Sequence, residues 1–286
     1  MSAIAKFDLK AYMKARADEV DAALGAFLPA GGAYLGRVGE AMRYSVFPGG
    51  KRFRPVLALA ACEAMGVPRA QAMPVACAYE MVHCFSLVHD DLPCMDDDDE
   101  RRGKPTCHKA FGEDLALLAG DGLMIWAFHA LAESDVPGPA LRQLVRDLAE
   151  ASGHPGMVGG QVIDLDGQKR GRVDAAGLLA IHEAKTGALI RGSVRGGALV
   201  GGAEGDSLHR LSEYGKRVGL VFQITDDILD AEQDPEPVSF PALFGMDESH
   251  RMARAAVDES LDFLSTFGPG AEPLRRLATF LLDRSH

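Results

Sequence analysis

The stretch QAMPVACAYEMVHCFSLVHDDLPCMDDDDERRGKP, residues 71–105, joins an apolar helical segment to a crowd of acidic side chains. Residues 71–91 carry apolar side chains at helical spacing, and Pro93 disfavours the helical conformation at the residue before it, so the predicted helix ends near Asp91. Six aspartates fall within the ten positions 90–99, and two arginines follow. A solvated turn and a buried functional cluster both fit this run when it is considered alone.

A second acidic group lies in QITDDILD, residues 223–230, inside another apolar helical segment. Asp226 and Asp230 are four residues apart and therefore project from one face of a helix, with Gln223 one turn before Asp227. Burying carboxylates on an apolar helix is costly unless they have partners. This group alone is also compatible with a surface helix, but two such groups, each beside an apolar helix, are seldom incidental.

Carboxylates from the two segments would converge if both helices faced one cavity. His83 and Asp90 share a stripe of the first helix. Two carboxylates brought within about 4 Å of each other would repel by roughly 4 kcal/mol at an effective dielectric near 20. Cations or protonation must relieve this repulsion. Oxygen ligands favour Mg²⁺, which binds through a few carboxylates together with substrate phosphates, and Arg101 and Arg102 would then meet phosphate oxygens.

Helical periodicity runs through most of the chain, and strand-like alternation is scarce. The pattern predicts further helices from Pro55 to about Gly66 and over residues 110–133, 139–153, 174–200, 206–231, 247–267 and 272–284. No linker long enough to separate domains is evident. We therefore expect a single all-α domain over residues 1–286.

Composition narrows the class of protein. A net charge of −11 argues against a nucleic-acid groove and against a basic membrane-binding surface. Five cysteines without CxxC spacing fit a reducing cytoplasm better than a disulfide framework or a zinc site. The first residues lack an apolar secretory core, and no uncharged apolar run reaches the ~18 residues of a membrane helix. We expect a cytoplasmic protein with no membrane span.

Six segments, in this order along the chain, resemble the trans-prenyl diphosphate synthases, in particular those of the bacterial farnesyl diphosphate synthase type. They are GGKRFRP (49–55), HDDLPCMDDDDERRGKPTCHKAFGE (89–113), LLAGD (117–121), GGQVIDL (159–165), HEAKTGALIR (182–191) and GLVFQITDDILD (219–230). The resemblance extends from about residue 40 to the C-terminus. GGKRFRP alone fits an ordinary loop-to-helix junction, although its glycines allow close backbone approach and the following helix start attracts anions.

The resemblance implies an isoprenoid-synthase-like bundle of helices around a deep central cavity, and a homodimer. It implies a reaction that joins isopentenyl diphosphate head to tail with dimethylallyl or geranyl diphosphate. Three Mg²⁺ ions in the active site would help the allylic diphosphate to ionise to a carbocation, and an apolar cavity would keep water from that cation. The released diphosphate would accept the proton that is lost.

The resemblance also assigns roles to residues of this chain. Those that match the metal-binding aspartates are Asp90, Asp91, Asp96, Asp226, Asp227 and Asp230. Those that match the contacts to the allylic substrate are Arg101, Lys185, Thr186 and Gln223. Those that match the contacts to isopentenyl diphosphate are Lys51, Arg54, His83 and Arg102, and Gly50 beside them is also expected to bind substrate. Among these, the group we expect to carry the reaction is Asp90, Asp96, Arg101, Lys185 and Asp226. Asp121 and Asp164 lie in similar motifs but receive no assigned role.

Two positions before Asp90 bear on product length. Phe85 and Ser86, five and four residues upstream, lie where the family sets the length of its product, and a bulky aromatic ring at 85 would stop growth early. With the two extra residues in DDLPCMD, this resembles enzymes that make the C15 product. The hypothesis is therefore farnesyl diphosphate, with the C20 product, geranylgeranyl diphosphate, as the alternative.

One segment departs from the family pattern. After DDILD the family has a loop with a Gly-Lys pair and a further lysine, whereas this chain has only AEQDPEPVSFP (231–241) and no lysine after Lys216. Lost charge-assisted contacts are worth roughly 1.5–3 kcal/mol each in buried sites. A weakly active or non-catalytic partner subunit of a prenyl synthase is thus a second hypothesis. A terpene cyclase is a third, although it would need neither GGKRFRP nor His83.

Overall fold

The computed structural model describes residues 7–47, 50–170, 173–233 and 238–283, and almost all regular structure within them is helical. The all-α prediction is confirmed. The helices are α1 Leu9–Phe27, α2 Gly36–Val46, α3 Phe53–Ala64, η1 Arg69–Ala72, α4 Met73–Asp90, α5 Cys107–Phe111, α6 Glu113–Ala132, α7 Gly138–Ser152, α8 Met157–Arg170, α9 Ala175–Ile181, η2 His182–Gly187, α10 Ala188–Val200, α11 Gly205–Gln233, α12 Phe240–Phe244, α13 Met246–Phe263, η3 Pro269–Ala271 and α14 Glu272–Asp283. Between α4 and α5, strands β1 (Glu100–Arg101) and β2 (Lys104–Pro105) pair antiparallel as a short hairpin.

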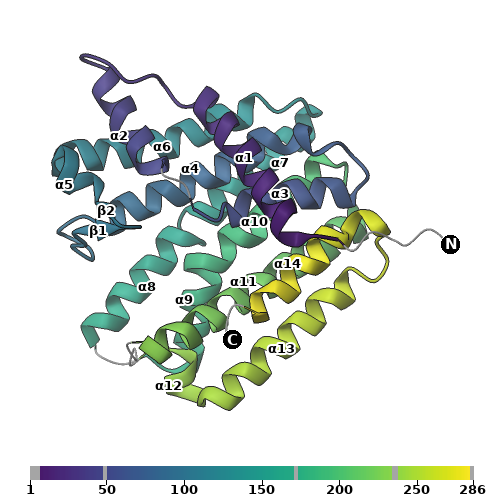
Figure 1. The fold of residues 1–286 in the computed structure, drawn as a ribbon. Coiled ribbons are helices and arrows are strands. Elements are labelled where there is room, and N and C mark those ends of the chain that lie inside the picture. The colour runs from purple at the N-terminus through teal and green to yellow at the C-terminus, as the bar shows by residue number, and fades with distance from the viewer. Residues whose placement is uncertain (1–6, 48–49, 171–172, 234–237, 284–286) are drawn as a thin grey trace.

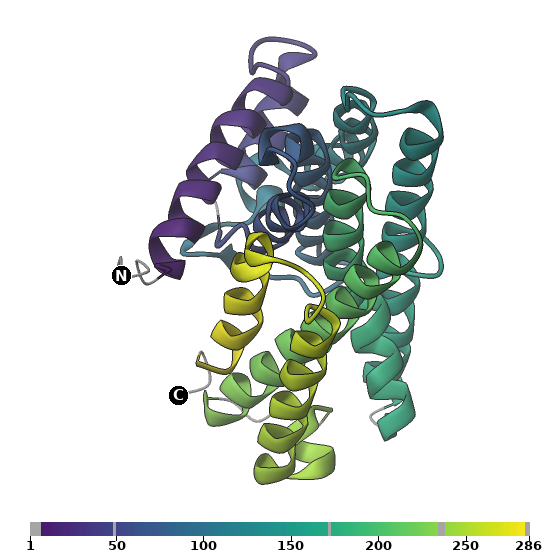
Figure 2. The same cartoon turned by 90° about the vertical axis from the view of Figure 1, so that its right-hand side faces the viewer.

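Helix α4 is central to the fold because it is apolar on nearly every side. Its residues from Val75 to Val82 are all buried, and α3, α6 and α10 pack around it (Figure 1). Helix α1 and the helices around residue 150 lie on opposite sides of the molecule in Figure 2. A helix that is apolar all round belongs in a protein core, so the segment that ends in the first aspartate motif is held rigidly from all sides.

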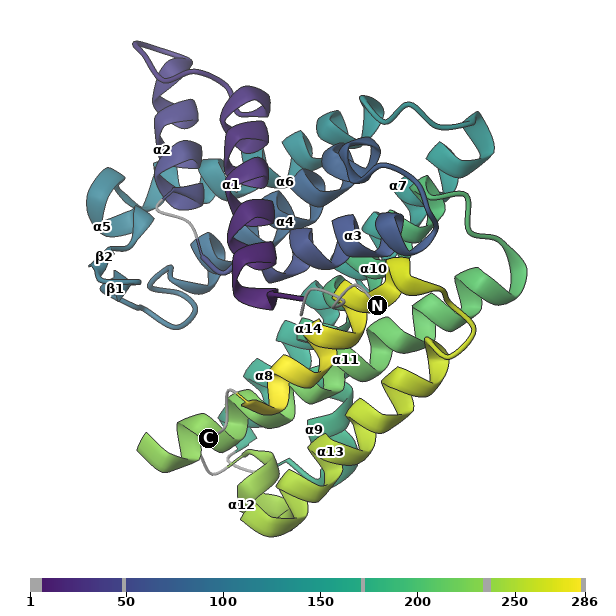
Figure 3. The same cartoon turned by 45° about the vertical axis from the view of Figure 1, so that its right-hand side comes forward.

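The C-terminal half adds a second layer of helices. Helix α13 lies along α11, and α14 packs between α11 and α1 (Figure 3). Gly197 of α10 makes this layering possible, because a Cβ atom there would lie 1.9 Å from the carbonyl oxygen of Ala58 in α3. Helices α3 and α10 therefore pack backbone against backbone, and α11 packs against α10.

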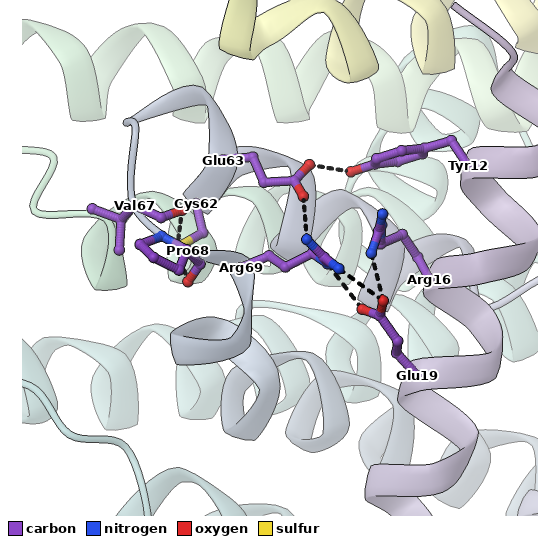
Figure 4. A network of polar contacts seen from close by, with 8 residues as sticks. All are labelled: Tyr12, Arg16, Glu19, Cys62, Glu63, Val67, Pro68 and Arg69. Carbon is purple, nitrogen blue, oxygen red and sulfur yellow. Dashed lines mark hydrogen bonds and ion pairs between the residues drawn. The ribbon is translucent and has the colours of Figure 1, made fainter.

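Helix α1 is fastened to the bundle by a polar network (Figure 4). Tyr12 donates a hydrogen bond of 2.6 Å to Glu63 of α3, and Arg69 of η1 forms two bonds of 2.9 Å with Glu19. Arg16 bonds the same Glu19 carboxylate at 2.6 Å. Charge-assisted bonds of this kind are stronger than neutral ones, so the network fixes α1 to the end of α3 and to η1.

Helix α6 is the most apolar long helix among the described residues. By length and composition alone, with a mean hydropathy of 1.6 over its best window, it would pass for a membrane span, a test that buried core helices also pass. It carries Glu113, Asp114 and Asp121, so the run is not uncharged. In this fold α6 packs along α4 and α2.

Candidate active site

The first aspartate motif folds back on itself at the end of α4. Helix α4 ends at Asp90, and the N–H of Asp96 donates a 2.9 Å hydrogen bond to the carbonyl oxygen of Asp90. Asp97 takes a left-handed conformation (φ 54°), which completes the turn. The helix therefore ends where the sequence predicted, and Asp90 and Asp96 lie side by side.

Burial makes these carboxylates reluctant to ionise. Desolvation raises the pKa of Asp90 to about 6, against the opposing effect of Lys185, and raises the pKa of Asp96 from its ordinary value in the same way. Lys185 thus lowers the pKa of both groups, which places its positive charge near the first aspartate motif. It is held by Asp164, whose Oδ2 lies 2.6 Å from the Lys185 Nζ. Asp164 had no assigned role in the sequence analysis, yet it positions the lysine.

Asp91 points the other way, toward the β-hairpin. Its side chain is buried, and its Oδ1 accepts a 2.6 Å bond from Arg101, which also bonds Asp98 at 2.9 Å. Burial raises the pKa of Asp91, and the Arg101 hydrogen bond lowers it. Asp91 therefore orients Arg101 in this structure, and its carboxylate already accepts a protein donor.

The hairpin turn places the next arginine. Arg102 and Gly103 both have positive φ, of 56° and 75°, as a two-residue type I′ turn requires. The Arg102 guanidinium lies over Gly50, because a Cβ atom at residue 50 would fall 2.8 Å from it. In this structure the guanidinium occupies the space that a side chain at residue 50 would take.

A cavity of about 440 Å³ lies beside this arginine. The residues that line it include the four that resemble isopentenyl diphosphate contacts, together with the expected substrate-binding glycine, namely Lys51, Arg54, His83, Arg102 and Gly50. Its apolar wall includes Phe53 and Phe222, whose rings stack with centroids 5.4 Å apart. Segments far apart in the sequence therefore form one basic cavity with an apolar side.

The cationic and imidazole groups of the cavity influence one another. Burial lowers the pKa of His83 well below its ordinary value, and Arg54 and Arg102 lower it further, so the imidazole is neutral at pH 7. Burial also lowers the pKa of Arg54, while Glu80 and Asp226 raise it. Phe222, one helical turn before Asp226 on α11, lines the same cavity, so the second aspartate motif begins close to it.

Arg52 anchors the segment that carries Lys51 and Arg54. It has φ 47°, rare for a residue with a side chain, and its side chain is fully buried. It donates bonds of 2.7 Å to Asp21 and to Glu80, and of 2.8 Å to the carbonyl oxygen of Val46. The residues on either side of Arg52 are therefore held at the cavity wall from three directions.

The second aspartate motif lies on α11, and its residues differ in orientation. Asp227 Oδ2 accepts a 2.8 Å bond from the N–H of Phe240 in α12 and lies 3.3 Å from the Nε2 of His182. Gln223 contacts the other nitrogen of His182 at 2.8 Å, and that ring stacks on Phe240 with centroids 5.3 Å apart. In this structure Asp227 and Gln223 tie α12 to the site. Asp230 is exposed.

Lys185 and Thr186 lie in a π-helical turn. The expected helix over residues 174–200 is divided into α9, the π-helix η2 and α10. π-helical turns inside α-helices are frequent at functional sites. Gly160 of α8 packs directly on this turn, because its Cβ atom would lie 2.3 Å from the backbone nitrogen of Lys185.

The donor set suits Mg²⁺. It consists of carboxylate oxygens from two motifs, and these are the ligands that Mg²⁺ prefers. Desolvation raises the pKa values of Asp90 and Asp96 more than the positive charge of Lys185 lowers them, so a cation there would be favourable. No three acidic, histidine or cysteine side chains in the described part of the chain lie close enough together to hold a metal by themselves. Substrate oxygens and water would have to complete the coordination.

Three residues of the site escaped the sequence analysis. Arg52 was read only as part of GGKRFRP, and Glu80 was not considered, although it lies one helical turn before His83. His182 was noted only within its motif. The lysine-free segment 231–241 lies partly outside the described residues, which stop at 233 and resume at 238.

Comparisons with known proteins identify the family of this chain. The polyprenyl synthetase family model matches residues 36–244. A dimethylallyltranstransferase from Fischerella ambigua is 42% identical over 99% of this chain and 85% of its own, and a chloroplastic geranylgeranyl pyrophosphate synthase from Catharanthus roseus is 42% identical over 100% and 84%. The crystal structure of an FPP/GFPP synthase from Zymomonas mobilis is 41% identical, with a TM-score of 0.92 over 96% of this chain and 98% of that one.

Proposed function

The chain belongs to the polyprenyl synthetase family of trans-prenyltransferases, and we propose that it joins isopentenyl diphosphate to dimethylallyl or geranyl diphosphate, with farnesyl diphosphate as its product. The observation that carries this proposal is the juxtaposition of two unlike sites. A basic cavity with an apolar wall is lined by His83 of α4, and the same helix ends at half-buried Asp90, which together with Asp96 needs positive charge. One diphosphate would bind through cationic side chains and the other through metal.

The metal would be held by both aspartate motifs. The residues we assign to three Mg²⁺ ions are Asp90, Asp91, Asp96, Asp226, Asp227 and Asp230. Mg²⁺ bound there would draw electrons from the allylic diphosphate and so ease the breaking of its C–O bond. Asp227 and Asp91 would act chiefly through the groups they orient, since each already bonds a protein donor.

The remaining groups bind and orient the two substrates. Lys185, fixed by Asp164, and Arg101, fixed by Asp91, would contact the allylic diphosphate. Lys51, Arg54 and Arg102 would hold isopentenyl diphosphate. The neutral imidazole of His83 can donate one N–H to its phosphate oxygens without adding to the repulsion among the arginines.

The carbon–carbon bond then forms inside an apolar space. The double bond of isopentenyl diphosphate attacks the allylic cation, and the released diphosphate takes the proton that is lost. Stacked Phe53 and Phe222 exclude water from this side of the cavity, which protects the cation from hydrolysis.

Product length is the finer part of the proposal. Phe85 is buried one and a half helical turns before Asp90, where its ring would stop a chain growing along α4. The relatives carry names for C20 synthesis as well as FPP, so geranylgeranyl diphosphate is the alternative. We expect Phe85→Ala to lengthen the product, and an unchanged product would remove Phe85 as the floor.

One assay separates the candidate functions. The purified protein is incubated with Mg²⁺, geranyl diphosphate and isopentenyl diphosphate, and the chain length of the product is determined. We expect C15 diphosphate. C20 diphosphate as the main product would favour the alternative. Diphosphate release without isopentenyl diphosphate would indicate a cyclase, and no turnover with any starter would indicate the partner subunit suggested by the absence of lysine after Lys216.

We also propose a cytoplasmic homodimer. All five cysteines are free thiols, which supports a reducing compartment. Helix α6 supports the dimer, because Leu117, Leu118 and Ile125 are 46%, 55% and 62% exposed on an otherwise apolar helix. Such a patch on a protein surface is typical of an interaction site.

A further inference from the structure

The imidazole of His89 lies between the proposed chain-length floor and helix α6. Its ring meets that of Phe85 edge to face, with centroids 4.8 Å apart and an interplanar angle of 77°. On its other side, Nε2 lies 3.0 Å from the carbonyl oxygen of Leu117, so the imidazole donates this bond. His89 is also the residue immediately before Asp90, and no role has been given to it above.

The imidazole of His89 packs directly against the backbone of Gly120 in α6. A Cβ atom on Gly120 would lie 2.2 Å from the Nε2 of His89 and 2.3 Å from its Cδ2, far inside van der Waals contact. Only glycine therefore lets the ring lie against α6. Asp121 Oδ1, at 3.9 Å from Nε2, is the nearest carboxylate on this side.

We propose that His89, seated on Gly120, is a positioning residue that fixes the ring of Phe85 and thereby limits product length. This inference rests on the proposed function, because it concerns the floor of the same allylic tunnel. Phe85 can turn only if its neighbour gives way, and His89 is held by a hydrogen bond to a helix backbone rather than by other mobile side chains. The floor is thus a pair of rings braced against α6, not one side chain.

The test compares product lengths of His89→Ala, Gly120→Ala and the double variant. In His89→Ala the ring of Phe85 loses its edge contact, and we expect the ratio of C20 to C15 diphosphate to rise at least threefold. In Gly120→Ala the new methyl group must push the imidazole from Leu117, with the same direction of change. In the double variant no imidazole remains to be displaced, so its ratio should equal that of His89→Ala alone.

The matched control is His129→Ala. His129 also contacts an aromatic ring, that of Trp126 with centroids 5.0 Å apart, but it lies exposed near the other end of α6. Its product ratio should stay at the wild-type value. Equal ratios in wild type, His89→Ala and Gly120→Ala would overturn the proposal, as would additive effects in the double variant. If the wild type makes C20 diphosphate, the same comparisons apply to the next longer chain.

A crystal structure of the Gly120→Ala protein tests the brace without turnover. We expect the imidazole to leave the Leu117 carbonyl and the Phe85 ring to change its rotamer. An imidazole and a Phe85 ring in unchanged positions would contradict the proposal even if the enzyme were inactive. Absence of any prenyl transfer by the wild type, with the rings moved as expected in the variant, would instead contradict the proposed function alone.

Discussion

Asp90 is the residue at which function and stability conflict most clearly. Its side chain is largely removed from water, close to Asp96, and burial raises its pKa to about 6. A carboxylate in this position is ionised at pH 7 only at a cost to the folded state. Metal and substrate would compensate for that cost, which explains why the residue is tolerated in an otherwise apolar helix.

The first prediction is that Asp90→Asn stabilises the metal-free protein. A pKa that rises from 3.8 to about 6 corresponds to at most about 3 kcal/mol at pH 7, and partial solvation reduces this to about 1–3 kcal/mol. Because the folded state holds its proton more tightly, wild-type stability should fall as pH rises from about 4 to about 6, and the gain from asparagine should grow over the same range. Urea unfolding in EDTA at pH 4.5 and 7 measures this. A destabilised variant at pH 7 would contradict it.

Arg52 shows a residue whose importance lies in its neighbours. A left-handed conformation costs a side-chain-bearing residue about 1 kcal/mol or more, and buried bonds to Asp21 and Glu80 hold it there. The GGKRFRP motif predicted that Lys51 and Arg54 would contact a substrate diphosphate. They could not predict this conformation, because it depends on helices α1 and α4, far away in the sequence.

The second prediction concerns this anchor. Glu80→Gln keeps the shape of the side chain but removes the charge that faces Arg52, so Lys51 and Arg54 should lose their fixed positions. We expect the KM for isopentenyl diphosphate to rise about tenfold, or about 1.4 kcal/mol, with little change in the KM for geranyl diphosphate. Steady-state kinetics with each substrate varied gives both values.

Asp147→Asn is the control for this change. Asp147 forms a comparable ion pair, 2.6 Å from Arg195, between α7 and α10, and neither residue lines the 440 Å³ cavity. It should lower stability without a selective effect on isopentenyl diphosphate. Equal effects of Glu80→Gln on both KM values would refute the anchoring role of Arg52.

Among the elements, the π-helix η2 was the least predictable. The residues 182–187 read as continuous helix, because nothing in HEAKTG breaks the helical pattern. A π-helical turn contains one residue more than an α-helical turn. The contacts that accompany it here are tertiary, namely the packing of the Lys185 backbone on Gly160 and the Asp164–Lys185 ion pair. Helix α4 was predictable for the opposite reason, since its start, its apolar run and its end are all local signals.

The third prediction tests this contact between α8 and η2. Gly160→Ala places a methyl group against the backbone of Lys185, which cannot yield as a side chain would, so we expect at least a tenfold loss of turnover and a lower Tm. Gly25→Ala is the control, because its Cβ meets nothing within 4 Å inside helix α1; it should raise stability by about 0.5–1 kcal/mol and leave activity unchanged. Full activity of Gly160→Ala would show that the close packing is dispensable.

Helix α12 joins the second aspartate motif to the C-terminal layer. The Ser239 side chain caps its N-terminus. The N–H of Phe240 donates a hydrogen bond to Asp227, and its ring stacks on His182, so α12 is fixed directly after the segment that lacks the expected lysines. The missing lysines are visible in the sequence, whereas the bond from the Phe240 N–H to Asp227 is not. The attachment could not be foreseen, because Asp227 was assigned to metal by its motif alone.

For the whole molecule, family motifs predicted which residues would converge, and the structure brings five of them into one cavity. That success rests on helix α4, which is buried on nearly every side, and on the buried apolar residues of α11 before the second aspartate motif. The single-domain assignment, the roles of the site residues and the subunit number stay predictions. The support for a dimer is indirect and consists of the exposed apolar side chains of α6.

The fourth prediction concerns that surface. Leu118 and Ile125 are seven residues apart on one face of α6, so Ile125→Asp would bury a charge in any interface formed there. Sedimentation equilibrium should show a dimer for the wild type and a monomer for Ile125→Asp. Exposed Val162 of α8 gives a control, since Val162→Asp should leave the dimer intact. A wild-type monomer, or a dimer that survives Ile125→Asp, would exclude this interface.

The most direct test of two unlike diphosphate sites is calorimetric titration with and without Mg²⁺. Isopentenyl diphosphate should bind in EDTA, because Lys51, Arg54, His83 and Arg102 supply its contacts from the protein itself. An unreactive thio analogue of geranyl diphosphate should bind only when Mg²⁺ is added. If isopentenyl diphosphate also needed Mg²⁺, or if the analogue bound equally well in EDTA, the assignment of the two sites would be contradicted.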